Sequence, residues 1–279
     1  METSPPPVLP EAAHSCLRDV FGHARFRGTQ DAVVAQLLAG GHALVVMPTG
    51  GGKSICYQLP ALLRPGVGVV VSPLVALMQD QVAALEANGV RAAALHSHID
   101  RDTQFAIEQR CRQGELDLLY CAPERLLQER TLALLAQCRV ALIAIDEAHC
   151  VSQWGHDFRP EYQQLAQLAT RFPQVPRIAL TATADERTRK DIAHCLQLAD
   201  GQTFISGFDR PNIHYAIVEK TRPREQLLEF IRMQPSGASG IVYALSRKGV
   251  DGLAEWLSQK GLTALPYHAG MSAADRQRH

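Results

Sequence analysis

A glycine-rich turn at residues 47–54, MPTGGGKS, carries residue types that bind a chain of phosphates. It follows the apolar run HALVVM and precedes a stretch of helical period. Glycines allow the backbone to fold around an anion, so that several N–H groups and the positive end of a helix converge on it. Lys53 would neutralise the β and γ phosphates, and the Ser54 hydroxyl is a ligand for Mg²⁺. The residues expected to bind the phosphates of a nucleotide here are Thr49, Gly50, Gly51, Gly52, Lys53 and Ser54.

This turn departs in one place from the general pattern G-x-x-x-x-G-K-[ST], because Met47 stands at the position of the first glycine. The alternative is an ordinary strand-to-helix turn. Three consecutive glycines followed by Lys and Ser, in a strand–loop–helix setting, favour the phosphate-binding loop over that alternative.

An acidic pair ends a second apolar run, VALIAIDEAH at residues 140–149. Asp146 and Glu147 come at the carboxyl end of the expected strand, which is the edge where open α/β sheets bind ligands. The Asp146 carboxylate suits Mg²⁺, together with Ser54, and Glu147 beside it can polarise an attacking water. Acidic pairs also occur as plain helix caps, so the assignment depends on Lys53 upstream. The predicted catalytic residues are Lys53, Asp146 and Glu147.

The elements that would position these groups alternate between short apolar runs and segments of helical period. Such alternation is typical of a parallel, doubly wound α/β sheet with crossover helices. The expected strands are 42–47, 67–72, 91–95, 116–120, 140–146 and 177–182, with helices starting near residues 53, 75, 100, 125, 161 and 185. Beyond a turn-rich boundary at 200–212, further strands are expected at 213–218, 240–245 and 263–268, with helices near 223–233 and through residue 256.

The composition excludes several classes of protein. Lys and Arg total 28 against 28 Asp and Glu, and 46% of the residues are hydrophobic, which argues against a disordered or polybasic chain. Any nucleic-acid site must therefore be a local arrangement of residues. The 7 cysteines lack C-x-x-C spacing, so we expect reduced thiols and no zinc. With a proline-rich leader at 1–14 and no long apolar run, we expect a cytoplasmic protein with no membrane segment.

The motifs along the chain resemble those of superfamily 2 DNA helicases, and more closely those of the RecQ family. DEAH at 146–149 and MPTGGGKS at 47–54 match the family's ATP motifs, and HCVSQWGHDFRPEY at 149–162 resembles its aromatic-rich loop. The other matches, in family order, are FRGTQ at 26–30, SPLVALMQDQ at 72–81, LTATA at 180–184 and FDRPNI at 208–213. The resemblance extends from about residue 15 to the last residue.

This resemblance implies an ATP-dependent 3′–5′ DNA helicase in recombination and repair, using ATP and Mg²⁺ on single-stranded DNA and duplex/single-strand junctions. It would associate with the nucleoid if the source is bacterial. The fold implied is a first RecA-like, P-loop NTPase lobe at 15–206 and the start of a second, incomplete RecA-like lobe at 207–279. The residues implied to contact the adenine are His23, Arg27 and Gln30. Those implied to sense DNA or couple it to hydrolysis are Trp154, His156, Phe158, Arg159, Thr181 and Thr183.

The residue types of the aromatic loop agree with that role. Trp154 and Phe158 can stack on unpaired bases, while Arg159 attracts phosphate. The alternative is that both aromatic side chains are core residues, but the surrounding Ser, Gly, Asp and Pro residues disfavour a buried helix. Weaker candidates for DNA contacts are Ser72, Arg210 and Asn212, for which turn-forming roles are equally open.

One motif of the family is missing from this sequence. No string of the type Q-x-x-G-R-x-G-R, which supplies an arginine to the γ-phosphate, occurs in the 279 residues. Such an arginine is worth about 10³–10⁵ in rate where it has been measured. We therefore expect this chain to bind ATP and Mg²⁺ but to hydrolyse ATP slowly, without unwinding. Two alternatives stay open: a nucleotide-gated DNA-binding module without motor activity, and an RNA helicase or translocase that shares the ATP motifs.

Overall fold

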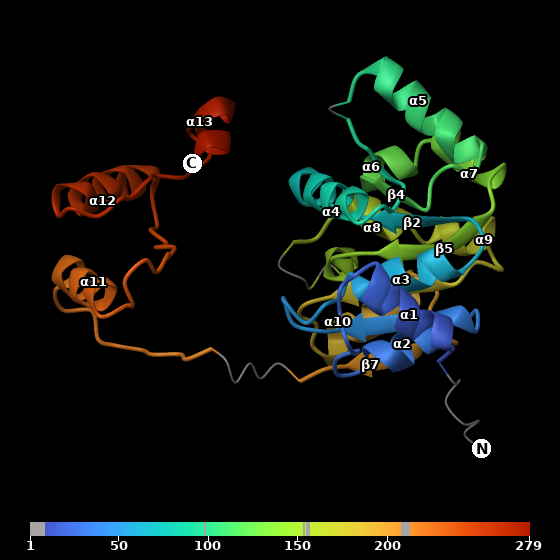
Figure 1. Cartoon of the computed structure of the whole chain (residues 1–279), viewed down its shortest axis with the longest axis horizontal. Helices are drawn as coiled ribbons and strands as arrows, with labels where there is room; N and C mark the ends of the chain where they lie inside the picture. Colours follow the sequence, from blue (N-terminus) through green and yellow to red (C-terminus); the bar gives the residue numbers. More distant parts are fainter. Residues whose placement is uncertain (1–8, 98, 153, 155–156, 208–212) are drawn as a thin grey trace. The chain divides into compact units, whose positions relative to one another are not determined.

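The computed structural model describes residues 9–279 except 98, 153, 155–156 and 208–212. The chain divides into two compact units, Met1–Arg210 and Pro211–His279. The first unit is a central sheet with helices packed on both faces (Figure 1). Within the described ranges, no helix combines the length and the apolar character needed to cross a bilayer.

The sheet of the first unit has seven parallel strands in the order β3-β4-β2-β5-β6-β1-β7. Most of their residues are buried, because helices cover both faces of the sheet. The strands are β1 Ala43–Val46, β2 Val67–Val71, β3 Ala92–Leu95, β4 Leu118–Cys121, β5 Val140–Ile145, β6 Arg177–Thr181 and β7 Gln202–Ile205. The predicted α/β class and the six strands predicted up to residue 182 are confirmed.

Two hydrophobic cores lie on opposite faces of this sheet, because successive side chains of a strand point to opposite faces. One core is covered by α2 Gln30–Leu38, α3 Ile55–Leu63 and α4 Val75–Ala87, with α1 Glu11–Asp19 packed outside α2 and α3. The other face carries α5 Arg101–Arg112, α6 Pro123–Leu126, α7 Glu129–Ala136, η1 Ala148–Val151, α8 Pro160–Gln164, α9 Gln167–Arg171 and α10 Glu186–Cys195.

Two features of the first unit differ from the sequence-based expectation. Strand β7 lies inside the segment 200–212, which we expected to be a turn-rich boundary. It is an edge strand with Phe204 as its one buried residue, so its hydrophobic signal is weak. Helix α1 begins at Glu11, inside the expected leader 1–14, and buries Ala13.

The second unit contains three helices, α11 Pro223–Arg232, α12 Arg247–Gln259 and α13 Ala273–Arg278. Its described residues include no strand, so the strands predicted at 213–218, 240–245 and 263–268 are wrong for this structure. These segments are apolar, but Ile217 and Leu245 are fully exposed. An extended segment becomes a strand only when a neighbour satisfies its backbone hydrogen bonds, and no neighbour does so among these described residues.

Candidate functional site

The glycine-rich loop connects β1 to α3 and needs its glycines for two different reasons. Gly50 and Gly52 have positive φ values of 77° and 80°, which residues with a Cβ rarely adopt. At Gly51, a Cβ would lie 2.6 Å from Met47 Cγ and 2.9 Å from the carbonyl oxygen of Pro48. Met47, at the position where the general pattern has glycine, is buried and packs against this turn. The loop therefore tolerates methionine there because its side chain points inward.

The residues predicted for catalysis meet in one open pocket of about 310 Å³ at the carboxyl edge of the sheet. Lys53 reaches across the loop and donates from Nζ to the carbonyl oxygen of Met47, 3.0 Å away. Asp146 and Glu147 line the same pocket. The other lining residues are Thr49, Gly50, Gly52, Ser54, Tyr57, Ser72, Leu77, Met78, Gln81 and Tyr120.

The acidic pair is held rigidly at the end of β5. The Asp146 N–H donates to the carbonyl oxygen of Val71 at 2.9 Å, and the Tyr162 hydroxyl donates to the Asp146 carbonyl oxygen at 3.0 Å. Glu147 has left-handed backbone angles, φ 49° and ψ 44°, and its N–H donates to Asp146 Oδ1 at 3.0 Å. Such a conformation costs a non-glycine residue about 1–2 kcal/mol. The surrounding hydrogen bonds maintain it and turn the Glu147 side chain into the pocket.

Burial, together with the neighbouring Glu147 charge, raises the pKa of Asp146 to about 6, against the opposing effect of Lys53. A divalent cation beside this carboxylate would supply the missing positive charge and reverse the shift. The Ser54 hydroxyl lines the same pocket, and hydroxyl and carboxylate oxygens are the ligands that Mg²⁺ prefers. The residues present therefore fit the predicted Mg²⁺.

A chain of polar contacts leads from Glu147 to the loop after β6. His149 Nδ1 lies 3.4 Å from Glu147 Oε2 and 3.0 Å from the Thr181 hydroxyl. The Thr181 hydroxyl donates to the Thr183 carbonyl oxygen at 3.1 Å. These contacts connect Glu147 to Thr181 and Thr183, the two threonines predicted to couple DNA binding to hydrolysis. We assigned no function to His149 from the sequence, although it is part of the DEAH string.

A hydrogen bond and a cation–π contact link the aromatic loop after η1 to α10. The Ser152 hydroxyl donates to Asp191 Oδ2 at 2.8 Å and accepts from the Trp154 N–H at 3.2 Å. The Arg187 guanidinium lies over the Trp154 ring, 3.3 Å from its centroid. We missed Arg187 and Asp191 in the sequence, although their i, i+4 spacing after LTATA places both on one side of a helix.

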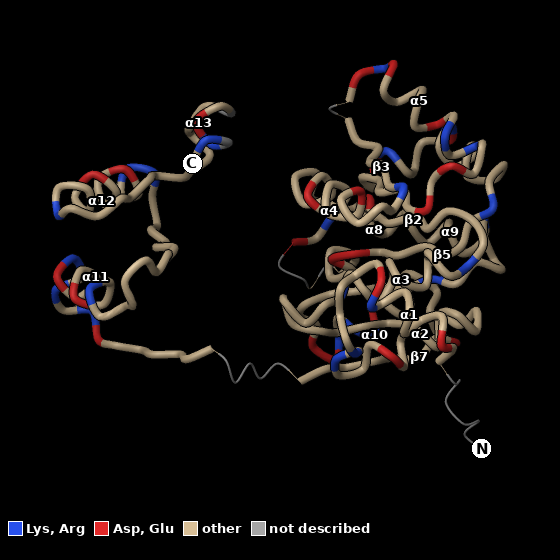
Figure 2. Tube along the Cα trace, in the orientation of Figure 1, with Lys and Arg blue, Asp and Glu red and all other residues tan. Residues whose placement is uncertain are grey.

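Trp154 is 63% exposed and Phe158 is 37% exposed, which contradicts the alternative that both are core residues. The Arg159 N–H closes the loop by donating to the Cys150 carbonyl oxygen at 2.9 Å. The Arg159 side chain pairs with Asp157 at 3.1 Å. Figure 2 shows basic and acidic residues interspersed along the described trace, in keeping with the balanced charge of the chain.

Gln30 lies behind the phosphate loop. Its Nε2 donates to the carbonyl oxygens of Gly51 and Gly52 at 3.2 and 3.1 Å, while its Oε1 accepts from the Arg27 N–H at 2.8 Å. His23 and Arg27 line a separate hollow beside this segment. The adenine contacts of His23, Arg27 and Gln30 stay predictions, but Gln30 clearly braces the loop.

Ser72 lies in the nucleotide pocket and is 3% exposed, with no hydrogen-bond partner for its hydroxyl within the described structure. Its place in the pocket fits a role beside the phosphates, and the predicted DNA contact of Ser72 stays a prediction. His156, Arg210 and Asn212, also predicted to contact DNA, lie outside the described residues.

A buried polar network forms one wall of the same pocket. Gln58 Nε2 donates to the Tyr120 hydroxyl at 2.8 Å and to Gln81 Oε1 at 3.0 Å. The Tyr57 and Tyr120 hydroxyls are 3.5 Å apart. We did not predict this network, because the four residues come from three separate segments.

One group of described residues has the donor types of a metal site. His149, Cys150 and Asp157 place ligand atoms within 4.8 Å of one another. Cys150 donates to Asp157 at 3.7 Å, and Arg159 neutralises that carboxylate, so hydrogen bonding accounts for the arrangement. The expectation that this chain binds no zinc stays a prediction.

Comparison with known proteins places these motifs in a family. Residues 27–192 match the family model described as DEAD/DEAH box helicase. The chain is 49% identical to the ATP-dependent DNA helicase RecQ of Haemophilus influenzae, over 95% of this chain and 43% of the relative. It is 47% identical to the protein of the same name from Pasteurella multocida, over 97% and 43%. This chain therefore spans less than half of either relative.

Solved structures agree on the fold. The crystal structure of the DUF1998 helicase MrfA matches with a TM-score of 0.64 at 19% identity, over 91% of this chain and 41% of that chain. A hypothetical ATP-dependent RNA helicase from Sulfolobus tokodaii matches with a TM-score of 0.56 at 19% identity, over 88% and 72%. At such low identity the likeness concerns the α/β fold alone.

Proposed function

The chain belongs to the DEAD/DEAH box helicase family, and from this premise we propose that it is the ATP-binding part of a RecQ-like DNA helicase. The observation that carries the proposal is the convergence of Lys53, Asp146 and Glu147 on one pocket beside a glycine-rich loop. We also propose two domains, a first RecA-like lobe at 15–206 and the start of a second at 207–279.

The residues of the pocket have separate tasks in ATP hydrolysis. The loop amides and Lys53 bind the β and γ phosphates. Ser54 and Asp146 would hold Mg²⁺, which would neutralise charge that develops on the phosphates. Glu147 orients the attacking water and accepts its proton. Its strained backbone fixes the carboxylate before the nucleotide arrives, so that little reorganisation is needed in the transition state.

The chain of contacts through His149 and Thr181 supplies a route by which DNA affects hydrolysis. Single-stranded DNA stacked on Trp154 and Phe158 would displace Arg187 from the Trp154 ring or share that ring with it. The same loop begins directly after η1, which carries His149. A displacement of Trp154 by bound DNA would therefore move His149 relative to Glu147 and change the alignment of the Glu147 carboxylate with the water.

The resemblance to RecQ proteins also supports four finer parts of the proposal. The helicase would move 3′–5′ on single-stranded DNA. It would act at duplex/single-strand junctions. Its cellular roles would be recombination and repair. A bacterial protein of this kind would associate with the nucleoid.

The test is ATP hydrolysis by this chain with and without single-stranded DNA, for the wild type, Lys53→Ala and Trp154→Ala. We expect slow turnover that Lys53→Ala abolishes and that DNA accelerates only when Trp154 is present. The control is Trp256→Ala, which removes the other tryptophan, in α12, and should behave as the wild type.

Other outcomes favour the alternatives. Nucleotide binding that changes DNA affinity, with no turnover under any condition, would indicate a nucleotide-gated binding module. Stimulation by single-stranded RNA well above that by DNA of the same sequence would indicate an RNA helicase. Nucleotide binding that survives Lys53→Ala would refute the proposed site itself.

A further inference from the structure

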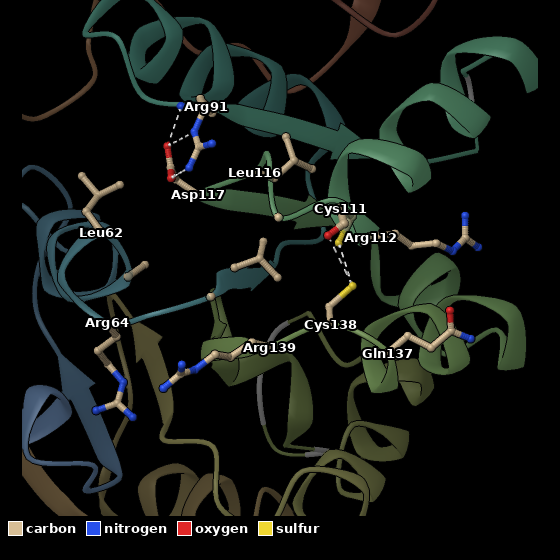
Figure 3. Close-up of a pocket in the computed structure, with 14 residues that line it drawn as sticks. Leu62, Arg64, Arg91, Cys111, Arg112, Leu116, Asp117, Gln137, Cys138 and Arg139 are labelled. Atoms are coloured by element: carbon tan, nitrogen blue, oxygen red, sulfur yellow. Dashed lines mark hydrogen bonds and ion pairs between the residues drawn. The ribbon is translucent and has the colours of Figure 1, made fainter.

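A second pocket lies at the opposite edge of the sheet from the pocket of Lys53 and Asp146. It encloses about 240 Å³ and is lined by residues at the amino ends of β2, β4 and β5, including Val67, Leu116 and Arg139. Because β2 runs from this pocket to the other one, they are separated by roughly 16 Å, the length of five residues in a strand. Figure 3 shows that this second pocket holds two cysteines and several arginines.

The two cysteines come from different elements and face each other. Cys111 is in the last turn of α5, and Cys138 follows α7 just before β5. Their sulfur atoms are 3.6 Å apart (Figure 3). Cys138 also donates to the carbonyl oxygens of Cys111 and Leu134 at 3.4 and 3.3 Å. A disulfide needs about 2.05 Å between the sulfurs, so a side-chain movement of roughly 1.5 Å would join them.

The two thiols differ in access. Both line the pocket, but Cys111 is 2% exposed, whereas Cys138 is only partly buried. Burial, reinforced by the adjacent Cys138, raises the pKa of Cys111 and so disfavours its thiolate. An oxidant that enters the pocket therefore meets Cys138 first, with Cys111 behind it as a resolving thiol.

The charge of the pocket favours a negatively charged oxidant. Of its four arginines, Arg91 is neutralised by Asp117 at 2.6 Å, and Arg64 donates to three backbone carbonyl oxygens. Arg112 and Arg139 flank the two cysteines in the sequence, and no carboxylate pairs with either within the described residues. The pocket thus keeps positive charge beside the thiols.

We propose that Cys111 and Cys138 are a reversible dithiol switch, oxidised to a disulfide by small anionic disulfides of the glutathione type. The Cys138 thiol loses its proton to water. The resulting thiolate attacks one sulfur of the small disulfide and releases the other half as a thiolate. Cys111 loses its proton and attacks the Cys138 sulfur of this mixed disulfide, which releases the second thiolate. Two protein thiols are oxidised, and one small disulfide is reduced to two thiols.

The disulfide would close a loop between residues 27 positions apart and link α5 to the segment between α7 and β5. It therefore stabilises one layer of helices without touching the nucleotide pocket. A loop of this length predicts an increase in melting temperature of about 5–10 °C on oxidation. ATP binding should stay unchanged.

The experiment incubates the reduced chain with glutathione disulfide, blocks free thiols and maps peptides without reduction. We expect a linked Cys111–Cys138 peptide, loss of two thiols and the higher melting temperature, all reversed by dithiothreitol. Cys111→Ser should accumulate a glutathione adduct on Cys138, whereas Cys138→Ser should leave Cys111 unmodified. Cys195→Ser, which removes a partly buried thiol on α10, is the matched control and should form the link normally.

A pair that stays reduced through this incubation, whether or not the partly buried Cys16 and Cys195 react, overturns the proposal. So does a link that involves a different cysteine in place of either partner. The charge argument has its own test in Arg139→Gln. This variant should react roughly two- to fivefold more slowly with glutathione disulfide, and equally fast with the uncharged disulfide of 2-mercaptoethanol. If Arg139→Gln reacts with glutathione disulfide as fast as the wild type does, the role of the arginines is refuted.

Discussion

The two edges of the central sheet carry opposite kinds of chemistry. At the carboxyl edge, an acidic pair and a single lysine surround a space that suits a polyphosphate and a divalent cation. At the amino edge, arginines surround two thiols, and the one carboxylate of the lining is already paired. Both edges depend on glycine backbone: Gly50 and Gly52 have positive φ values at the first, and Gly66, with a φ of 113°, lies at the second, where a Cβ would collide with the Arg139 carbonyl oxygen.

This difference in lining side chains reflects what a parallel sheet places at each edge. A parallel sheet delivers loops at its carboxyl edge and helix-to-strand connections at its amino edge, so ligand sites concentrate at the first. Side-chain changes at the amino edge should therefore affect stability or redox state while ATP chemistry continues.

The largest expected effect is at Glu147. Glu147→Gln keeps the side-chain shape but removes the proton acceptor, so ATP turnover should fall about 10²–10⁴-fold. ATP affinity should stay within about threefold, because the phosphates are bound by the loop and Lys53. Steady-state hydrolysis and equilibrium nucleotide binding measure the two quantities. Arg139→Gln at the other edge should change neither, and a turnover defect in that variant would break the comparison.

A smaller effect is expected at Gly51. Gly51→Ala places a Cβ against Met47 and the Pro48 carbonyl, so the loop must shift at a cost of about 1–3 kcal/mol. The defect should appear as weaker ATP binding with a modest loss of stability, measured by nucleotide titration and urea denaturation. The control is Gly252→Ala in α12, where the added Cβ meets no atom within 4 Å. If the two variants bind ATP equally well, the phosphate loop is not under this steric constraint.

Trp154→Ala should weaken binding of single-stranded DNA by about 1–3 kcal/mol, since one stacked base is lost. Fluorescence anisotropy of a labelled oligonucleotide gives the affinity. Phe105→Ala, in α5, removes another exposed aromatic side chain and should bind DNA like the wild type. A matching loss in both variants would mean that Trp154 contributes no more than general surface hydrophobicity.

The smallest effect concerns Asp117 at the amino edge. Burial alone would raise its pKa, but hydrogen bonds and charge from Arg91 outweigh burial and lower it. Since Arg91 is half exposed, Asp117→Asn should cost only about 0.2–1 kcal/mol of unfolding free energy at pH 7.

That difference has a defined pH dependence. A lowered pKa in the folded state gives stability that is present above the ordinary aspartate pKa of about 3.9 and is lost as the pH falls further. Urea denaturation of both proteins between pH 7 and pH 3 should show the gap closing at the acid end. A gap that widens toward low pH would contradict the assigned ion pair.

The sequence predicted the parts of the site that depend on local pattern. Lys53, Asp146 and Glu147 follow strands whose apolar runs are unmistakable, and parallel strands bring their carboxyl ends to one edge. It did not predict Arg187 stacked on Trp154, because that contact joins two segments with no shared pattern. Apolar runs at 213–218 and 240–245 misled us, since hydrophobicity signals a strand only when a partner strand exists.

The contact between Arg187 and Trp154 makes the intrinsic tryptophan fluorescence of the protein a signal for DNA binding. The sequence has two tryptophans, and Trp154 lies exposed beneath a guanidinium, 3.3 Å from the ring centroid. Replacing Trp256 by Phe would leave all indole emission with the aromatic loop. A base that stacks on that ring would quench its fluorescence, so the arrival of DNA could be timed by stopped flow without any label.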